Sequence, residues 1–107
     1  MILIVDDEIT AVKCVEALLT PRHYRVVTAL SGEEALHVLH GEKPDLILLD
    51  VLMPGLDGFE ICRRIKTNAE TQLTPVLLMT VLNDMEDRIK GFDAGADDFL
   101  SKPVHRG

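Results

Sequence analysis

Short apolar runs recur along the chain, each followed by a longer segment with helical periodicity, and this alternation restricts the fold more than any other feature. Three runs are continuous, without alternation of apolar and polar residues: Ile2–Val5, Leu46–Leu49 and Val76–Met79. Such runs are typical of strands covered on both faces, as in a parallel sheet. Arg25–Ala29 is less apolar and is predicted to form an edge strand, and Asp98–Ser101 is predicted to form a weaker fifth strand.

The segments between these runs carry helix signals. Ser31, Asp57 and Asn83 have side chains suited to a helix N-cap and are predicted to open the second, third and fourth helices. The predicted helix ends are Pro21, Gly41 and Gly95. Apolar residues at helical spacing are predicted to face the sheet: Ala11, Cys14, Val15, Leu18 and Leu19; Ala35, Val38 and Leu39; Ile61, Cys62 and Ile65; Met85, Ile89 and Phe92.

Alternation of strands and helices predicts an α/β fold, a doubly wound parallel sheet of five strands in the order 2-1-3-4-5. Because crossover connections are right-handed, the second, third and fourth helices then lie on one face and the first lies alone on the other. One helix cannot cover a face of five strands, and residues 104–107 are too few for another. We therefore expect residues 1–107 to be one domain, truncated before a fifth helix.

The composition excludes several classes of protein. The chain has 107 residues and a formal charge of −7, which disfavours direct binding to nucleic acid. No apolar run approaches the roughly 18 residues of a membrane span, and the N-terminus has neither the basic leader nor the cleavage site of a signal peptide. Two cysteines make no disulfide framework, so we expect a reduced, cytoplasmic protein.

Polar residues follow the predicted strands at the carboxyl edge of the sheet, where open α/β sheets bind their ligands. Asp6 and Asp7 follow the first strand and Asp50 follows the third, its neighbour in the predicted order. Thr80 follows the fourth strand and Lys102 the fifth. Two carboxylates about 4 Å apart repel by about 4 kcal/mol at an effective dielectric near 20. Three converging carboxylates therefore predict a hard divalent cation, Mg²⁺ or alternatively Mn²⁺.

An aspartate beside a cation, a hydroxyl and an ammonium group has the surroundings of a nucleophile that accepts a phosphoryl group. Taken alone, these residues have simpler interpretations: Asp6 and Asp7 would mark a helix N-terminus, which acidic residues favour, and Asp50 would be a turn residue. All five positions at one edge of the sheet are harder to explain in that way.

The sequence resembles the receiver (CheY-like) domain of bacterial two-component response regulators. The resemblance rests on Ile4–Glu8, Asp45–Asp50, Met53–Gly58, Thr80 and Gly95–Pro103, in family order and spacing over essentially the whole chain. It implies a regulatory domain rather than an enzyme, one that takes a phosphoryl group from the histidine of a sensor kinase or phosphotransfer protein. The implied output is an attached domain or a downstream protein.

The resemblance also implies a role for each site residue. Asp50 corresponds to the phosphoryl acceptor. Asp50, Asp7 and the backbone carbonyl of Leu52 correspond to direct Mg²⁺ ligands, and Asp6 to the acid that holds the metal through water. Leu52 and Leu82 are apolar where a polar side chain could orient a hydrolytic water, so we expect slow autodephosphorylation.

The remaining implied roles concern switching. Thr80 and Phe99 correspond to the switch pair, in which the hydroxyl turns to the phosphoryl group and the ring swings inward. Lys102 corresponds to the lysine that pairs with the phosphoryl group, and its bond to Pro103 to the family's cis peptide. On the face of the fourth helix and fifth strand, the charges Arg88, Asp97 and Asp98 resemble those that pair in regulator homodimers, although a solvated face explains them equally well.

Three other functions fit the sequence less well. A phosphatase similar to the haloacid dehalogenase group needs Asp-x-Asp after the first strand, where this chain has Asp6-Asp7-Glu8. A nucleotide or flavin binder needs a Gly-rich or Ser/Thr-rich loop there, and an acidic loop repels phosphate. A docking module that is never phosphorylated would not need the acceptor residues, and this chain has all of them.

Several residues are interpreted as structural or solvated. Cys14 and Cys62 are predicted to be small core residues. His37 and His40 are predicted to be exposed, and Arg63, Arg64 and Lys66 to form a solvated stripe.

Overall fold

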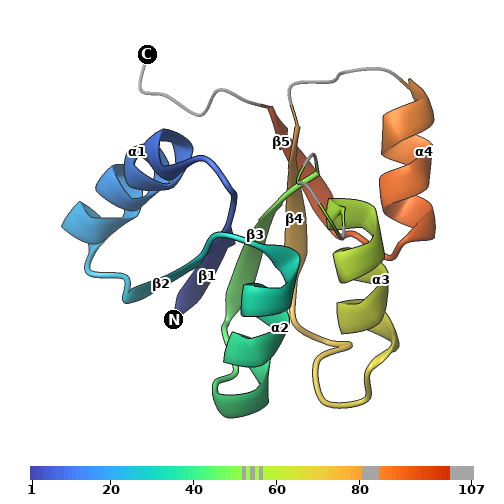
Figure 1. Ribbon diagram of the computed structural model, residues 1–107, viewed down its shortest axis with the longest axis horizontal. Coiled ribbons are helices and arrows are strands. Elements are labelled where there is room, and N and C mark those ends of the chain that lie inside the picture. Colours follow the sequence, from blue (N-terminus) through green and yellow to red (C-terminus); the bar gives the residue numbers. More distant parts are fainter. Residues whose placement is uncertain (52, 54, 56, 81–84, 102–107) are drawn as a thin grey trace.

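The computed structural model describes residues 1–51, 53, 55, 57–80 and 85–101. In this part of the chain, five parallel strands form one sheet in the order β2-β1-β3-β4-β5 (Figure 1). The predicted fold class and strand order are thus confirmed. The strands are β1 (Ile2–Val5), β2 (Val26–Ala29), β3 (Leu46–Asp50), β4 (Val76–Thr80) and β5 (Asp98–Ser101).

The helices begin and end at residues that the local sequence explains. The Ser31 hydroxyl accepts a hydrogen bond from the Glu34 backbone N–H, and the Asp57 carboxylate accepts one from the Glu60 N–H, so both predicted N-caps are confirmed. Gly95 has a φ of +96°, which suits the left-handed turn after the last helix. The helices are α1 (Ile9–Leu19), the 3₁₀ turn η1 (Thr20–Arg22), α2 (Gly32–Gly41), α3 (Gly58–Thr67) and α4 (Met85–Asp93).

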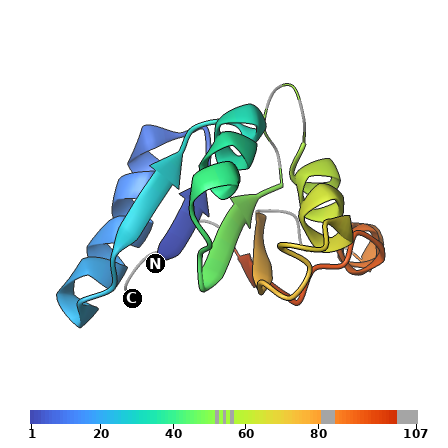
Figure 2. The ribbon, with the colours of Figure 1, turned by 90° about the horizontal axis from the view of Figure 1, so that it is seen from below.

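The two faces of the sheet carry separate hydrophobic clusters, because successive side chains of a strand point to opposite faces. From β1, Leu3 and Val5 join the cluster that contains residues of α2 and α3, while Ile2 and Ile4 join the one that contains residues of α1. Figure 2 shows α2, α3 and α4 following one another along the sheet. The predicted division, with α1 on one face and the later helices on the other, agrees with these clusters.

The face against α1 is less completely covered than its opposite. Leu46, Leu77 and Leu100 pack against its cluster but are only partly buried. The expectation of a missing helix concerns residues 102–107, which lie outside the described residues. None of the helices in the described part of the chain has the length and apolarity needed to cross a bilayer.

The structure corrects the predicted inner face of two helices. In α1 the buried residues are Val12 and Val15, whereas Cys14 is exposed, so its assignment to the core is wrong. In α4 the predicted inward residues Met85, Ile89 and Phe92 are 71%, 52% and 56% exposed. The residue that α4 buries is Gly91, so its apolar stripe lies on the outer face.

In α3 the prediction holds for Ile61, Cys62 and Ile65, which are buried. The predicted solvated stripe is confirmed for Arg63 and Arg64, whose side chains are about half exposed. The separate prediction that His37 and His40 of α2 are exposed is also confirmed. Lys66 does not belong to the solvated stripe, because its side chain is only 13% exposed.

Candidate functional site

Three carboxylates meet at the carboxyl edge of the sheet. Val5, the last residue of β1, is paired with Leu49, so Asp6 and Asp7 emerge beside Asp50 at the end of β3. One carboxylate oxygen from each of the three residues lies within 4.8 Å of the others. Asp6 is fully buried and Asp50 is 4% exposed, whereas Asp7 is exposed. The convergence expected from the sequence is therefore present.

The local backbone holds two of these residues in place. The Asp6 carboxylate accepts a hydrogen bond from the Glu8 backbone N–H at 3.0 Å, just before α1 begins. At the other strand, the Gly58 N–H donates to the Val51 carbonyl at 3.0 Å. This bond brings the first residue of α3 against the end of β3, directly beside Asp50.

Gly58 shapes the site although its role was not singled out from the sequence. A Cβ atom at this position would lie 2.2 Å from the Asp50 carbonyl oxygen and 2.7 Å from the Val51 Cα. Backbone atoms cannot move aside as a side chain can, so only glycine permits this approach. The available signal was the Asp57-Gly58 pair, an N-cap followed by the smallest residue.

Thr80 and Phe99 come from the two strands on the far side of β3. Thr80 ends β4 and is 6% exposed, and it is paired in register with Ser101 of β5. Phe99 is partly buried against the cluster of α2 and α3. Its ring lies edge-to-face with that of Phe92, with centroids 5.3 Å apart, and the Arg88 guanidinium carbon lies 5.7 Å from its centroid.

The predicted site residues Lys102 and Leu52 lie outside the described residues, as do Pro103 and Leu82. The described part of the predicted site is therefore Asp6, Asp7, Asp50, Thr80 and Phe99.

The carboxylate cluster suits a hard divalent cation. Its donors are oxygens from three acidic side chains, the ligand type that Mg²⁺ and Mn²⁺ prefer. Asp7 is exposed, so the cluster is reached from solvent on that side.

Lys66 of α3 lies in a second ionic group, at the opposite ends of the strands. Its side chain is 13% exposed, and its ammonium group lies 2.7 Å from Asp97 Oδ2 and donates to the Thr74 carbonyl at 2.7 Å. The same Asp97 oxygen accepts a hydrogen bond from the Val76 N–H. Lys66 is therefore a partly buried ion-pair partner, and its assignment to the solvated stripe is wrong.

Two pKa values reflect this packing. Burial alone would raise the pKa of Asp97, but hydrogen bonds from Lys66 and Val76 and the lysine charge hold it below its ordinary value. Burial raises the pKa of the Cys62 thiol to about 11, against smaller opposing effects of nearby basic groups. Cys62 is thus the inert core thiol that the sequence predicted.

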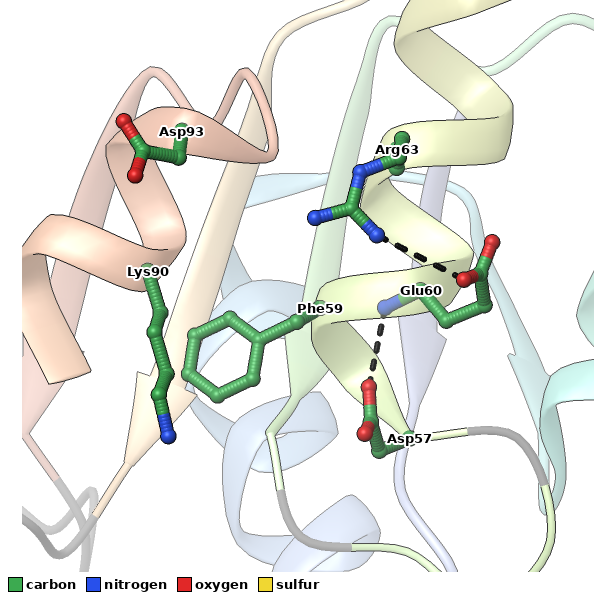
Figure 3. Close-up of a pocket in the computed structure, with 6 residues that line it drawn as sticks. All are labelled: Asp57, Phe59, Glu60, Arg63, Lys90 and Asp93. Carbon is green, nitrogen blue, oxygen red and sulfur yellow. Dashed lines mark hydrogen bonds and ion pairs between the residues drawn. The ribbon is translucent and has the colours of Figure 1, made fainter.

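A surface groove of about 380 Å³ lies between α3 and α4, and none of the three clustered carboxylates lines it. Figure 3 shows the Phe59 ring between the two helices, with Lys90 extended beside it and Arg63 turned toward Glu60. The groove is lined by Asp57, Phe59, Glu60, Arg63, Lys90 and Asp93. The residues that line the groove carry charges of both signs around the Phe59 ring and do not form a catalytic site.

Comparisons with known proteins agree with the fold. Residues 2–107 match the model of the response regulator receiver domain family. The chain is 48% identical over 103 residues to the response regulator PleD of Caulobacter vibrioides, and 45% identical over 103 residues to the transcriptional regulatory protein AfsQ1 of Streptomyces coelicolor. Each match covers 96% of this chain, but only 23% of PleD and 44% of AfsQ1.

A solved structure gives the same result. The chemotaxis protein CheY4 of Vibrio cholerae superposes with a TM-score of 0.92 at 34% identity, over 97% of this chain and 87% of that one. The fold and the acidic edge define a regulatory α/β domain of two-component signalling. This chain belongs to the response regulator receiver domain family.

Proposed function

We propose that this chain is a phosphoryl-accepting switch in which Asp50 is the acceptor. The observation that carries the proposal is the meeting of Asp6, Asp7 and Asp50 within 4.8 Å at the carboxyl edge of the sheet. In a family that signals through phosphorylation, the acceptor is expected among these three. Asp50 is the one that ends a central strand beside the start of α3.

The transfer conserves atoms and charge. The donor is the phosphorylated histidine of a sensor kinase or a phosphotransfer protein. An oxygen of the Asp50 carboxylate attacks phosphorus, an O–P bond forms, and the N–P bond breaks with its electron pair returning to the imidazole. The product is an acyl phosphate on Asp50. The chain itself acts as the acceptor and assists the transfer, so it is a regulatory domain rather than an enzyme with turnover.

The residues around Asp50 have separate tasks. Asp7, Asp50 and the Leu52 carbonyl would hold Mg²⁺, with Asp6 acting through water. A bound Mg²⁺ would supply positive charge that offsets the negative charge of the carboxylates and of the phosphoryl group. Thr80 would donate its hydroxyl to a phosphoryl oxygen, and Lys102 would pair with another. We expect slow autodephosphorylation, because Leu52 and Leu82 cannot orient a hydrolytic water.

The signal would leave through α4 and β5. Phosphorylation adds negative charge at Asp50. Thr80 and Phe99 would carry the change to α4, whose exposed Met85, Ile89 and Phe92 form an apolar stripe at i, i+4 and i+7. This stripe suits a partner protein, an output domain or a second copy of the chain. In a homodimer Arg88 and Asp98 would contribute charges, whereas Asp97 is already paired with Lys66.

We further propose that the domain works in the cytoplasm and leaves any contact with nucleic acid or membrane to other segments or partners. The charge of −7 supports the nucleic-acid part of this proposal.

The test uses the chain with Mg²⁺ and a small-molecule phosphodonor such as acetyl phosphate, read by intact mass. One added phosphoryl group is expected, and Asp50→Asn should abolish it. Asp57→Asn is the matched control, since it removes an acid from the same loop while asparagine preserves the N-cap. Labelling that survives Asp50→Asn would overturn the proposal, and sustained release of phosphate from a phosphate ester would favour a phosphatase.

A further inference from the structure

The ring of Phe99 lies between β5 and α4 and makes its contacts with one short stretch of that helix. Phe99 is partly buried on the strand side, next to Leu78 of β4 in the register of the sheet. On the helix side it meets the Phe92 ring edge-to-face and lies near the Arg88 guanidinium group. Arg88, Gly91 and Phe92 thus surround the ring from α4.

At Gly91 the ring takes the place of a side chain. A Cβ atom at this position would lie 2.2 Å from Phe99 Cζ, 2.8 Å from Phe99 Cε1 and 3.0 Å from Leu78 Cδ1. The ring therefore occupies the space that any other side chain at position 91 would need. Glycine is the poorest helix former apart from proline, so its place inside α4 is unfavourable for the helix and calls for a packing reason. The ring supplies that reason.

The same contact bears on how α4 is held. Gly91 is the buried residue of α4, and the apolar stripe of this helix points outward. The C-terminal end is fixed differently, since the Ala94 and Ala96 N–H groups both donate to the Gly91 carbonyl and the Ala94 carbonyl lies 3.6 Å from Cys62 Sγ. The last turn of the helix therefore rests on the Phe99 ring at Gly91, and the residues that follow the helix rest on α3 at Cys62.

We propose that Gly91 is a positioning residue that couples the Phe99 ring to α4. Because the ring fills the space beside a residue without a side chain, the ring cannot move without removing the support of α4. Likewise, α4 cannot approach the sheet further while the ring is there. This inference rests on the proposed role of Phe99 in switching. It adds the residue through which the movement of the ring reaches the outer, apolar stripe of the helix.

The primary variant is Gly91→Ala, and the matched control is Gly41→Ala. Gly41 is also helical, but a Cβ there would meet nothing within 4 Å. Alanine favours a helix, so Gly41→Ala should raise the melting temperature. Gly91→Ala should lower it, because the ring must be displaced. In a Phe99→Ala background only Leu78 Cδ1 remains close to the added Cβ, at 3.0 Å, so Gly91→Ala should then lower the melting temperature less than it does in the wild-type background.

A spectroscopic readout separates coupling from simple packing. In wild type, NMR should show contacts between the Phe92 and Phe99 rings. Beryllium trifluoride with Mg²⁺, used as a mimic of the phosphoryl group on Asp50, should shift the amide resonances of α4. Gly91→Ala should lose the ring contacts and reduce the shifts in α4 at least twofold, while Asp50 still accepts a phosphoryl group. Phe99→Leu keeps Gly91 and removes the ring, and it should also reduce the shifts of the α4 amide resonances. It replaces Gly91→Ala as the test variant if Gly91→Ala does not fold.

The outcomes distinguish this inference from the function on which it rests. Unchanged ring contacts and unchanged α4 shifts in Gly91→Ala would overturn the coupling and leave phosphorylation of Asp50 intact. Equal melting shifts for Gly91→Ala and Gly41→Ala would also overturn it. A wild-type chain that takes up no phosphoryl group would overturn the proposed function, and the switching role of the ring with it.

Discussion

The ion pair between Lys66 and Asp97 is expected to stabilise the fold far more than the surface pairs of the same helix. Lys66 Nζ lies 2.7 Å from Asp97 Oδ2 and donates to two carbonyl oxygens of the segment before β4, at 2.7 Å for Thr74 and 3.4 Å for Gln72. Its side chain is 13% exposed, and that of Asp97 is 48% exposed. The pair thus joins α3 to the turn that leads into β5.

The magnitude follows from this partial burial. Exposed pairs contribute about 0.2–1 kcal/mol, and hydrogen bonds to charged groups contribute about 1.5–3 kcal/mol when shielded from water. Because solvent reaches half of Asp97, we expect a coupling free energy of about 1–2 kcal/mol. Lys66→Met keeps the stem that packs beside Gly95 and removes the charge. It should lower the melting temperature by about 4–16 °C, at about 4–8 °C per kcal/mol for a small domain.

The assay is a double-mutant cycle of Lys66→Met and Asp97→Asn, measured by urea unfolding at several pH values. A carboxyl whose pKa is lowered in the folded state adds stability above its unfolded pKa and loses it as the pH falls through the folded value. The coupling should therefore be constant from about pH 5 to pH 8 and shrink below about pH 4, since the pKa of Asp97 lies below the ordinary 3.8.

The control cycle pairs Arg64→Met with Glu60→Gln, where both partners are exposed and 3.4 Å apart. It should give a coupling of less than about 0.5 kcal/mol. Equal coupling in the two cycles, or a Lys66–Asp97 coupling that does not shrink as the pH falls below about 4, would refute the reasoning.

Three further predictions concern the site and the core. Gly58→Ala should lower the free energy of unfolding by about 3 kcal/mol and impair phosphorylation, because its Cβ would lie 2.2 Å from the Asp50 carbonyl oxygen; normal stability in urea unfolding would contradict this. A thiol reagent should label the exposed Cys14 at once and Cys62 only on unfolding, as read by mass, and rapid double labelling of the native chain would be the opposite result. Mg²⁺ at about ten times its dissociation constant should add about 1.4 kcal/mol and raise the melting temperature by about 6–11 °C, and Asp7→Asn should reduce the shift; equal shifts in both proteins would exclude Asp7 as a ligand.

The strands and their order were predictable because their signal is local. Each central strand is a continuous apolar run, and the handedness of crossovers then leaves few topologies. The meeting of Asp6, Asp7 and Asp50 followed from that order, since β1 and β3 are neighbours whose carboxyl ends coincide. The strand order alone was enough to predict that these three carboxylates meet.

The inner face of α4 was not predictable from periodicity. Met85, Ile89 and Phe92 have helical spacing, but the helix meets the sheet through Gly91, which has no side chain to signal the contact. The ring that fills this space belongs to Phe99, on the following strand. In α4 the apolar stripe therefore marks the outer face, because the ring of Phe99 meets the helix at a residue that has no side chain.

The partners of Lys66 were equally hidden. Asp97 lies far along the chain, and the two carbonyl acceptors belong to the segment before β4. Neither the basic run on α3 nor the acidic pair Asp97-Asp98 at the start of β5 indicates which charges are exposed. Such pairs depend on tertiary packing, which the sequence pattern of a single helix does not contain.

The most direct test of the central claim is to locate the phosphoryl group chemically. After incubation with Mg²⁺ and acetyl phosphate, borohydride should reduce an acyl phosphate on aspartate to homoserine, and peptide mass spectrometry then identifies the residue. We expect homoserine at Asp50 alone, and none in Asp50→Asn. Homoserine at Asp6 or Asp7, or a phosphoryl group that resists borohydride, would contradict the account.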